Sequence, residues 1–422
     1  MDLTLDTKTG LIQHYPNKAW QYDYIPPGSA FKTNGVTFQA SMKLTIIVGQ
    51  MFGLNPVLGV SEKDSSLLRF SICSWRTTYS ILSILGQGTF VFFCILKLFK
   101  DTDVSLMSNT SIVFYATNCL TTILFLRIAT RWPRLCQQIS RIEAANPNPD
   151  STLIRKCNAA CIIILSLAVL EHVLSDLSAL SGVLDCPSPD GSPIYEAFIT
   201  HSFPWIYSYV AYNDVLGLLT QIVDIQCTFN WNFSDIFVIC ISLYLTSRLD
   251  QVYKRIVAVR GKYVPPTFWR AMREDYCRAT TLVRKIDDVI GGIIFISFAN
   301  NLFFICLQLL HTLADGVIQK PSCHYDSPDE RPLQGYENAV YFVYSFIFLV
   351  ARSLAVSLIA AQVHTASKRP AHALYRVSSA AYCVEVQRFL DQIHTDTVAL
   401  SGIQFFNVKR GLVLTIAGTI VT

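Results

Sequence analysis

Charged residues and enzyme motifs are both scarce in this chain. Asp, Glu, Lys and Arg make up 15% of its 422 residues, whereas 51% of the residues are hydrophobic and the mean hydropathy is positive. The sequence contains no glycine-rich phosphate loop, no His-Glu-x-x-His, no paired Cys-x-x-Cys and no Gly-x-Ser-x-Gly elbow. The composition argues against a water-soluble domain, and the missing motifs give no support for an enzyme, a cofactor or a metal site.

Long apolar runs account for the hydrophobic excess. They predict helices, because a lipid-exposed chain must satisfy its own backbone hydrogen bonds and the alternation typical of barrel strands is missing. We therefore expect an all-α integral membrane protein. The runs cover residues 75–97, 110–130, 158–180, 204–226, 234–247, 288–312 and 338–363, and a shorter run follows Val408.

The region before the first long run differs from a signal sequence. Residues 1–40 are polar and contain no apolar core followed by small residues, so no cleavable signal peptide is predicted. Residues 44–60 are apolar but are interrupted by three glycines and Pro56. We expect this segment to form a short helix that lies against the membrane or packs on the protein.

The distribution of Lys and Arg predicts the orientation in the membrane. The linkers at 131–156 and 248–285 are rich in basic residues and belong in the cytoplasm, whereas the loops at 181–204 and 313–337 carry few and belong outside. Together they require a cytoplasmic N-terminus, an odd number of spans and an outward C-terminus. The net charge of +4 comes from the cytoplasmic linkers, which favours contact with anionic membrane lipid over nucleic-acid binding.

An odd number of spans leaves one apolar run too many. The run at 204–226 contains Asn213, Gln221 and Asp224, so it either lies on the outer surface or extends the following helix outward. The count is then seven transmembrane helices. The seventh is incomplete, since fourteen residues follow Val408 and a helix needs about 20 to cross the hydrocarbon core.

Two features of the predicted outside loops concern covalent modification. Most of the thirteen cysteines fall in spans or cytoplasmic linkers, where they serve as small apolar residues or stay reduced. Cys186 and Cys323 each lie in an outside loop, so a disulfide between them is a reasonable hypothesis. Asn109-Thr-Ser is a glycosylation sequon at the outer mouth of the second span.

Polar side chains within the outer halves of the spans are candidates for a ligand site, because such groups are costly in a membrane and usually face a cavity, water or a partner. Carboxylates and amides that bind hydroxyls, interleaved with aromatic faces that stack on a sugar ring, would suit a neutral polyol. The alternative is that they join helices or form an interfacial belt. The candidates are Tyr115, Glu171, His172, Asp176, Trp231, Asp235, Asn300, Asn301, Gln308, Tyr341, Tyr344 and Phe348.

The stretch at 364–404 has helical periodicity and predicts an amphipathic helix in the cytoplasm. Its polar face is not strongly basic, so a subunit contact is favoured over adsorption to lipid. Folding back onto its own chain is the alternative. The apolar positions are Leu374, Val377, Ala381, Val384, Phe389, Leu390, Ile393 and Leu400.

The C-terminal residues carry a family resemblance. Phe405-Phe-Asn-Val-Lys-Arg410, followed by Ala417-Gly-Thr-Ile-Val-Thr422, resembles the C-terminal signature of insect gustatory receptors of the sugar-receptor branch. Further matches are Gly49–Val57, Leu68–Arg76, Arg131–Arg134 and Asn230–Asp235, so the similarity spans nearly the whole chain. The family continues with Thr-Tyr, several hydrophobic residues and Gln-Phe, of which only the opening Thr is present here.

The resemblance implies a sugar-gated, non-selective cation channel in the plasma membrane of sensory neuron dendrites. It implies seven helices, homo- or heterotetramers around a central pore, and a mono- or disaccharide bound in an outer pocket of each subunit. The chain then divides into a cytoplasmic region at 1–73, a six-helix ligand-binding domain at 74–363, and an anchor with the start of the pore helix at 364–422. Pore and anchor residues by this resemblance are Phe405, Phe406, Lys409, Arg410, Thr415, Thr419 and Thr422.

The missing end of the family signature qualifies this expectation. The outer part of the pore helix would lie beyond Thr422, so we expect the sequence to be incomplete and a form ending there to conduct poorly. A non-conducting receptor or modulatory subunit that requires another family member is the alternative function. A transporter is favoured less, since the two halves show no matching pair of broken helices.

Overall fold

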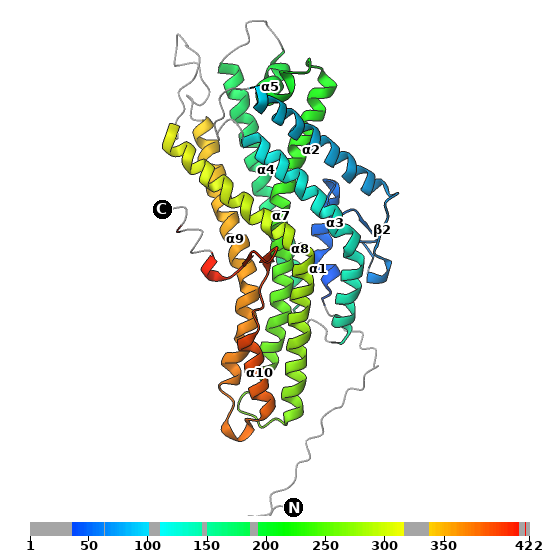
Figure 1. The fold of residues 1–422 in the computed structure, drawn as a ribbon, viewed down its shortest axis with the longest axis vertical. Helices are drawn as coiled ribbons and strands as arrows, with labels where there is room; N and C mark the ends of the chain where they lie inside the picture. Colours follow the sequence, from blue (N-terminus) through cyan, green and yellow to red (C-terminus); the bar gives the residue numbers. More distant parts are fainter. Residues whose placement is uncertain are drawn as a thin grey trace, which may run out of the picture. The chain divides into compact units, whose positions relative to one another are not determined.

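The computed structural model describes residues 36–62, 64–100, 110–145, 150–185, 193–315, 337–412 and 418, and this part of the chain is mostly helical (Figure 1). The helices are α1 (Phe38–Met51), α2 (Trp75–Lys100), α3 (Thr110–Ala145), α4 (Leu153–Asp185), α5 (Ile194–Ser202), α6 (Pro204–Tyr207), α7 (Asp214–Ala258), α8 (Pro266–Asp315), α9 (Glu337–Leu374) and α10 (Val384–Thr395), with 3-10 turns η1 (Ser65–Leu67) and η3 (Ser379–Ala381). Two short antiparallel ribbons accompany them: β1 (Val57–Leu58) pairs Val57 with Phe70 of β2 (Arg69–Phe70), and β3 (Ser401–Gly402) pairs Ser401 with Asn407 of β4 (Phe406–Asn407).

Among the described residues, six helices are long and apolar enough to cross a membrane, namely α2, α3, α4, α7, α8 and α9. They contain the predicted apolar runs, which confirms the helical class. The structure also decides between the two alternatives for the run at 204–226. From Asp214 onward this run is continuous with 234–247 in one 45-residue helix. It therefore extends the following helix and is not a separate crossing. The seventh helix and the orientation stay predictions.

Helix α7 is the centre of the bundle and contacts α1, α2, α3, α4, α5, α8 and α9. Every residue from Asn232 to Ser242 is buried. In the most apolar 18-residue stretch of α7, 78% of the residues are buried, against 22% in the corresponding stretch of α2. A helix that is apolar on all sides belongs in the interior, whereas the exposed apolar side chains of α2 and α4 suit contact with lipid. The polar groups of α7 must consequently find partners inside the protein.

Helix α1 packs on the protein, but its bounds differ from the expected 44–60. It begins at Phe38, where the Thr37 hydroxyl caps it by accepting from the Ala40 amide at 3.2 Å, and it ends at Met51. Gly53 and Asn55 have φ angles of 78° and 47°, which stop the helix. Its buried side contacts α4 and α7. The Gly49 position lies so close to Phe233 that an added Cβ would be 2.6 Å from the ring.

The single amphipathic helix expected over 364–404 is divided into several parts. Helix α9 continues to Leu374, a turn with η3 follows, α10 covers only 384–395, and the remainder is extended. The apolar face of α10 is buried against α8 and α9 of the same chain, while Val384 at its start is 64% exposed. Arg273 of α8 pairs with Glu385 of α10 at 3.2 Å. The chain folds back on itself here, which is the alternative stated above.

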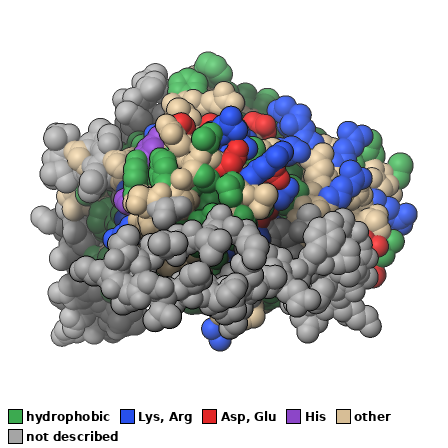
Figure 2. Space-filling model, turned by 90° about the horizontal axis from the view of Figure 1, so that it is seen from below, with side chains coloured by type: hydrophobic (Ala, Val, Ile, Leu, Met, Phe, Trp, Pro, Cys, Tyr) green, Lys and Arg blue, Asp and Glu red, His purple; other side chains and the backbone are tan. Residues whose placement is uncertain are grey.

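Basic side chains gather where α7 leads into α8. Figure 2 shows Lys and Arg with interspersed Asp and Glu on this end of the described bundle. Asp275 illustrates the pattern, since it pairs with both Arg255 and Arg278. These residues belong to the linker that the sequence placed in the cytoplasm.

Replacing Gly49 with Ala tests the packing of α1 on α7. The new methyl group would collide with Phe233, and overpacking of this kind costs about 1–3 kcal/mol. We expect a lower melting temperature in detergent micelles. Gly88→Ala is the matched control, because the Gly88 position in α2 has no neighbour within 4 Å and alanine favours a helix. Equal effects of the two substitutions would contradict the packing.

Candidate functional site

A cavity of about 550 Å³ lies between α3, α4, α7, α8 and α9. It is formed by the start of α3, the second half of α4, the first half of α7, the end of α8 and the start of α9, away from the basic α7–α8 linker. This volume is in the range of small-molecule pockets, roughly 300–1,000 Å³. Its lining consists of Thr110, Ser111, Phe114, Tyr115, Glu171, His172, Ser175, Ser178, Asp224, Thr228, Trp231, Phe304, Leu307, Gln308, His311, Asn338, Tyr341, Phe342 and Ser345.

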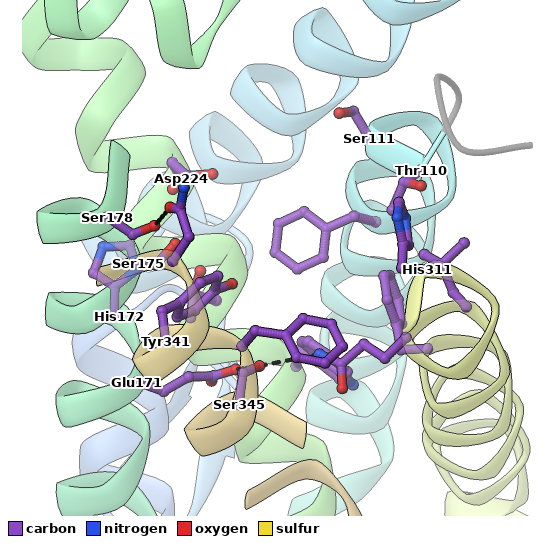
Figure 3. Close-up of a pocket in the computed structure, with 18 of the residues that line it drawn as sticks. Thr110, Ser111, Glu171, His172, Ser175, Ser178, Asp224, His311, Tyr341 and Ser345 are labelled. Carbon is purple, nitrogen blue, oxygen red and sulfur yellow. Dashed lines mark hydrogen bonds between the residues drawn. The ribbon is translucent and has the colours of Figure 1, made fainter. Parts of the chain in front are cut away.

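The structure brings together half of the candidate ligand residues. Those that line the cavity are Tyr115, Glu171, His172, Trp231, Gln308 and Tyr341. Figure 3 shows Glu171, His172, Ser175 and Ser178 along α4, facing Thr110, Ser111 and His311 across the space.

Several lining residues were not among the candidates, although helical spacing could have found them. Ser175 and Ser178 follow Glu171 by one and two turns, and Asp224 precedes Trp231 by two turns, so each shares a helix face with a predicted residue. Asp224 was taken only as an interruption of an apolar run. Ser345 likewise follows Tyr341 by one turn. Phe114 carried no such signal, because an aromatic residue is common in any membrane helix.

Hydrogen bonds across the cavity connect its helices. Ser345 of α9 donates to Glu171 Oε1 at 2.6 Å, and Gln308 of α8 donates to the Ser345 hydroxyl at 3.1 Å. On the other side, Tyr115 of α3 donates to Asp224 Oδ1 of α7 at 2.7 Å. Each carboxylate is thus held in place by a hydroxyl and still has an acceptor oxygen for which no partner is described.

Three polar atoms at the cavity are buried without a hydrogen-bond partner in the described part of the chain. They are His172 Nε2, Trp231 Nε1 and Gln308 Oε1. His172 Nε2 lies 3.7 Å from Asp176 Oδ2, which is too long for a hydrogen bond. Since buried polar groups are normally bonded, these atoms offer one amide acceptor, one indole donor and one imidazole nitrogen to a ligand.

Aromatic rings form the apolar part of the cavity lining. Trp231 of α7 lies 4.7 Å from Phe304 of α8 and 6.0 Å from Phe114 of α3, between ring centroids. Tilted and edge-on pairs at these distances pack favourably. The cavity therefore combines an aromatic cluster with carboxylate, amide and hydroxyl groups, which can stack on an apolar ring face and bind several hydroxyls of a neutral molecule.

The remaining candidates lie elsewhere. Asp176 lines a separate surface hollow between α4, α5 and α7. The Tyr344 hydroxyl donates to the Leu167 carbonyl at 3.0 Å, and its ring stacks on Phe348. Asn300 is buried but is not part of the cavity lining. None of these residues is part of the cavity lining.

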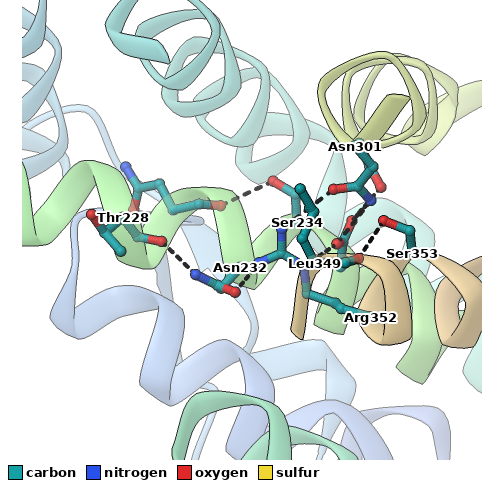
Figure 4. Close-up of polar contacts among 10 residues, drawn as sticks. Thr228, Asn232, Ser234, Asn301, Leu349, Arg352 and Ser353 are labelled. Carbon is teal, nitrogen blue, oxygen red and sulfur yellow. Dashed lines mark hydrogen bonds and ion pairs between the residues drawn. The ribbon is translucent and has the colours of Figure 1, made fainter. Parts of the chain in front are cut away.

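Asp235 and Asn301 belong to a buried polar network rather than to the cavity. Arg352 of α9 pairs with Asp235 and donates to Asn232 and Asn301, while Asn301 and Ser297 of α8 donate to Asp235 (Figure 4). These side chains bond to one another across three helices, although Arg352 Nε, 2.9 Å from Asp235 Oδ2, makes no aligned hydrogen bond among the described residues. Their arrangement matches the alternative that polar groups in spans join helices.

The residues assigned to pore and anchor by resemblance begin at a β-hairpin. Ile403 and Gln404 form its turn with φ angles of 51° and 60°, and Phe405 beside them is 85% exposed. Asp287 of α8 holds the hairpin, since it accepts from both the amide and the hydroxyl of Ser401 at 2.6 Å. Phe406 packs near Phe298, and Lys409 and Arg410 lie beyond it. Thr415, Thr419, Thr422, Asn109, Cys186 and Cys323 lie outside the described residues.

Comparisons with known proteins cover nearly the whole chain. A family model described as "Trehalose receptor" matches residues 18–422. The chain is 32% identical over 401 residues to gustatory receptor for sugar taste 64f of Drosophila melanogaster, covering 93% of this chain and 80% of the relative. It is 29% identical over 391 residues to gustatory receptor 5a for trehalose of the same organism, covering 92% and 83%.

A solved structure shows the same fold. The insect olfactory receptor OR5 from Machilis hrabei superposes with a TM-score of 0.64 at 13% identity, covering 90% of this chain and 95% of that chain. Its complex with eugenol gives a TM-score of 0.61 at 14% identity. At this identity the likeness concerns the fold alone.

Replacing Asp287 with Ala tests how the hairpin is held. The substitution removes the two carboxylate oxygens that accept from the amide and hydroxyl of Ser401. Hydrogen bonds to a charged group each contribute about 1.5–3 kcal/mol to stability. We expect a lower melting temperature and faster proteolysis within 401–407. Asp288→Ala is the control, because Asp288 is exposed and makes no hydrogen bond or ion pair among the described residues. Unchanged proteolysis of the Asp287 variant would count against this anchoring.

Proposed function

Because the chain belongs to the sugar-receptor branch of the insect gustatory receptors, we propose that it is a subunit of a sugar-gated, non-selective cation channel that serves as a sweet-taste receptor. The fold shared with an insect olfactory receptor supports a common architecture for ligand detection. In this proposal the subunits assemble as homo- or heterotetramers in the plasma membrane of sensory dendrites. The ligand shifts the channel toward its open state by binding that state more tightly.

The cavity between α3, α4, α7, α8 and α9 is the observation that carries the proposal. A mono- or disaccharide presents many hydroxyls and a weakly polar ring face. Glu171 of α4 and Asp224 of α7 offer acceptor oxygens, and Trp231 with Phe304 offers aromatic surface. The described lining contains two carboxylates and no Lys or Arg, which disfavours an anionic ligand, and its many hydroxyl and amide groups suit a neutral polyol. Trehalose is named for one relative and is therefore the first disaccharide to test.

The proposal assigns the ligand to this cavity and not to the hollow beside Asp176. Both Glu171 and Asp176 are carboxylates on α4, yet only Glu171 lines the cavity and accepts from Ser345. The Asp176 side chain is 40% exposed and lies among apolar residues of α4 and α5. The two positions therefore form a matched pair that separates a direct ligand contact from a nearby charge.

Replacing Glu171 with Gln tests the proposed contact. The substitution keeps the size of the side chain but removes a charged acceptor, which contributes about 1.5–3 kcal/mol when hydrogen-bonded. We expect the half-saturating sugar concentration to rise at least about tenfold, with surface expression unchanged. The measurements are sugar-evoked current, alone and with a second sugar-branch receptor, and sugar-induced stabilisation of the purified protein.

The control is Asp176→Asn, for which we expect a change below about twofold, because the side chain is outside the cavity. Equal losses in both variants would argue against the cavity as the site. Absence of current and of stabilisation with common mono- and disaccharides, despite surface expression of the unaltered chain, would overturn the proposed function itself.

A further inference from the structure

A fully buried ion pair lies beside the cavity wall. Arg352 of α9 is 3% exposed and Asp235 of α7 is 0% exposed, and Arg352 Nε is 2.9 Å from Asp235 Oδ2. Withdrawing two charges from water is costly, and apolar side chains of similar volume often stabilise a fold as well or better. A role for this pair in orienting other groups would explain its presence at the centre of the bundle.

The guanidinium of Arg352 is held from two further directions. Asn301 of α8 accepts from it at 3.3 Å, and Asn232 of α7 accepts another hydrogen bond (Figure 4). Asn301 also donates to Asp235 Oδ2 at 3.0 Å. Contacts from α7 and α8 therefore fix the plane of the guanidinium. A lysine ammonium has no plane to fix, so this arrangement is specific to arginine.

Two aromatic rings lie against this fixed guanidinium. Its central carbon is 4.6 Å from the centroid of Trp231 and 5.3 Å from that of Phe348, within the reach of cation–π attraction, about 6 Å. Trp231 lines the cavity, and its Nε1 has no hydrogen-bond partner among the described residues. Contacts of the ring, rather than a hydrogen bond, therefore set the direction of the indole N–H.

We propose that Asp235 and Arg352 are positioning residues for ligand recognition, which hold the Trp231 ring and its N–H in the orientation that meets a ligand in the cavity. Neither residue lines the cavity, so both act through Trp231. Asp235 orients the guanidinium, and the guanidinium supports the ring. This inference rests on the proposed function, because it takes the cavity as the sugar site.

A second, partly exposed ion pair provides a control for the joining of α7 to α9. Arg369 of α9 pairs with Asp250 of α7 at 2.6 Å. It joins the same two helices as Arg352 and Asp235, but it lies farther along both helices from the cavity and neither residue lines it. Its side chains are 40% and 22% exposed, so it controls for the joining of α7 to α9, and the cycle with Trp231→Leu below controls for the deeper burial of Arg352 and Asp235.

The experiment compares Arg352→Lys with Arg369→Lys in a double-mutant cycle with Trp231→Leu. We expect Arg352→Lys to raise the half-saturating sugar concentration about fivefold to tenfold with the maximal response unchanged, and Arg369→Lys to leave it within about twofold. In the Trp231→Leu background, Arg352→Lys should add almost nothing, because its effect passes through the missing ring. Additive losses, or equal effects of the two lysine variants, would overturn the proposal.

A second measurement does not depend on sugar. The fluorescence and near-ultraviolet circular dichroism of Trp231 are obtained from purified protein by subtracting the Trp231→Leu spectrum. We expect Arg352→Lys to change this difference spectrum and Arg369→Lys to preserve it. If the unaltered chain binds no sugar but the spectrum responds in this way, the proposed function fails while the positioning of Trp231 stands. An unchanged spectrum in Arg352→Lys overturns the positioning role.

Should Arg352→Lys fail to fold, Asp235→Asn combined with Arg352→Gln replaces it. The double variant leaves no unpaired charge in the interior, Asp235→Asn is isosteric, and Arg352→Gln keeps a polar side chain. We expect it to fold, to show a changed Trp231 difference spectrum and to bind sugar about tenfold more weakly. Normal sugar affinity in the folded double variant would refute the inference.

Discussion

The enclosure of α7 is the constraint on which the rest of the structure depends. Because other helices surround its buried stretch, no polar group there can reach water, and each must be bonded within the protein or remain unsatisfied at a cost. Trp231, Asn232 and Asp235 fall within two turns of this helix. Asn232 and Asp235 bond to Arg352, whereas the Trp231 N–H has no hydrogen-bond partner among the described residues. The same helix thus carries a closed polar network and part of an open site.

The two polar regions differ in charge balance as well as in hydrogen bonding. The network contains one acid and one arginine, and both are buried. The cavity contains two carboxylates, Glu171 and Asp224, with neutral donors around them. A site with excess acceptors and no facing cation suits a ligand that brings its own hydroxyl donors. Sugar recognition is consistent with this chemistry, and the aromatic cluster at Trp231 completes it.

Helical period explains which parts of the site the sequence could predict. Glu171, His172 and Trp231 were predicted because a carboxylate, an imidazole and an indole in a span are each costly or distinctive. Asp235 and Asn301 gave the same signal and yet pair with Arg352, since the period of a helix fixes the face of a residue but not the helix opposite that face. Asp224 shares a face with Trp231, and that spacing would have found it. Ser345 shares a face with Tyr341 in the same way, whereas Phe114 could be placed only by the residues it contacts.

By itself, the sequence determined the helical membrane class, the six long spans, the family and the separation of the polar groups at one end of the spans from the basic linker at the other. These follow from local composition and period, which act along the chain. Only the tertiary structure decided that α10 packs on α8 and α9, that Ser401 is held by Asp287, and that Asp176 is outside the cavity that Glu171 lines. Each depends on contacts between residues far apart in the chain, and such contacts depend on how the helices pack against one another.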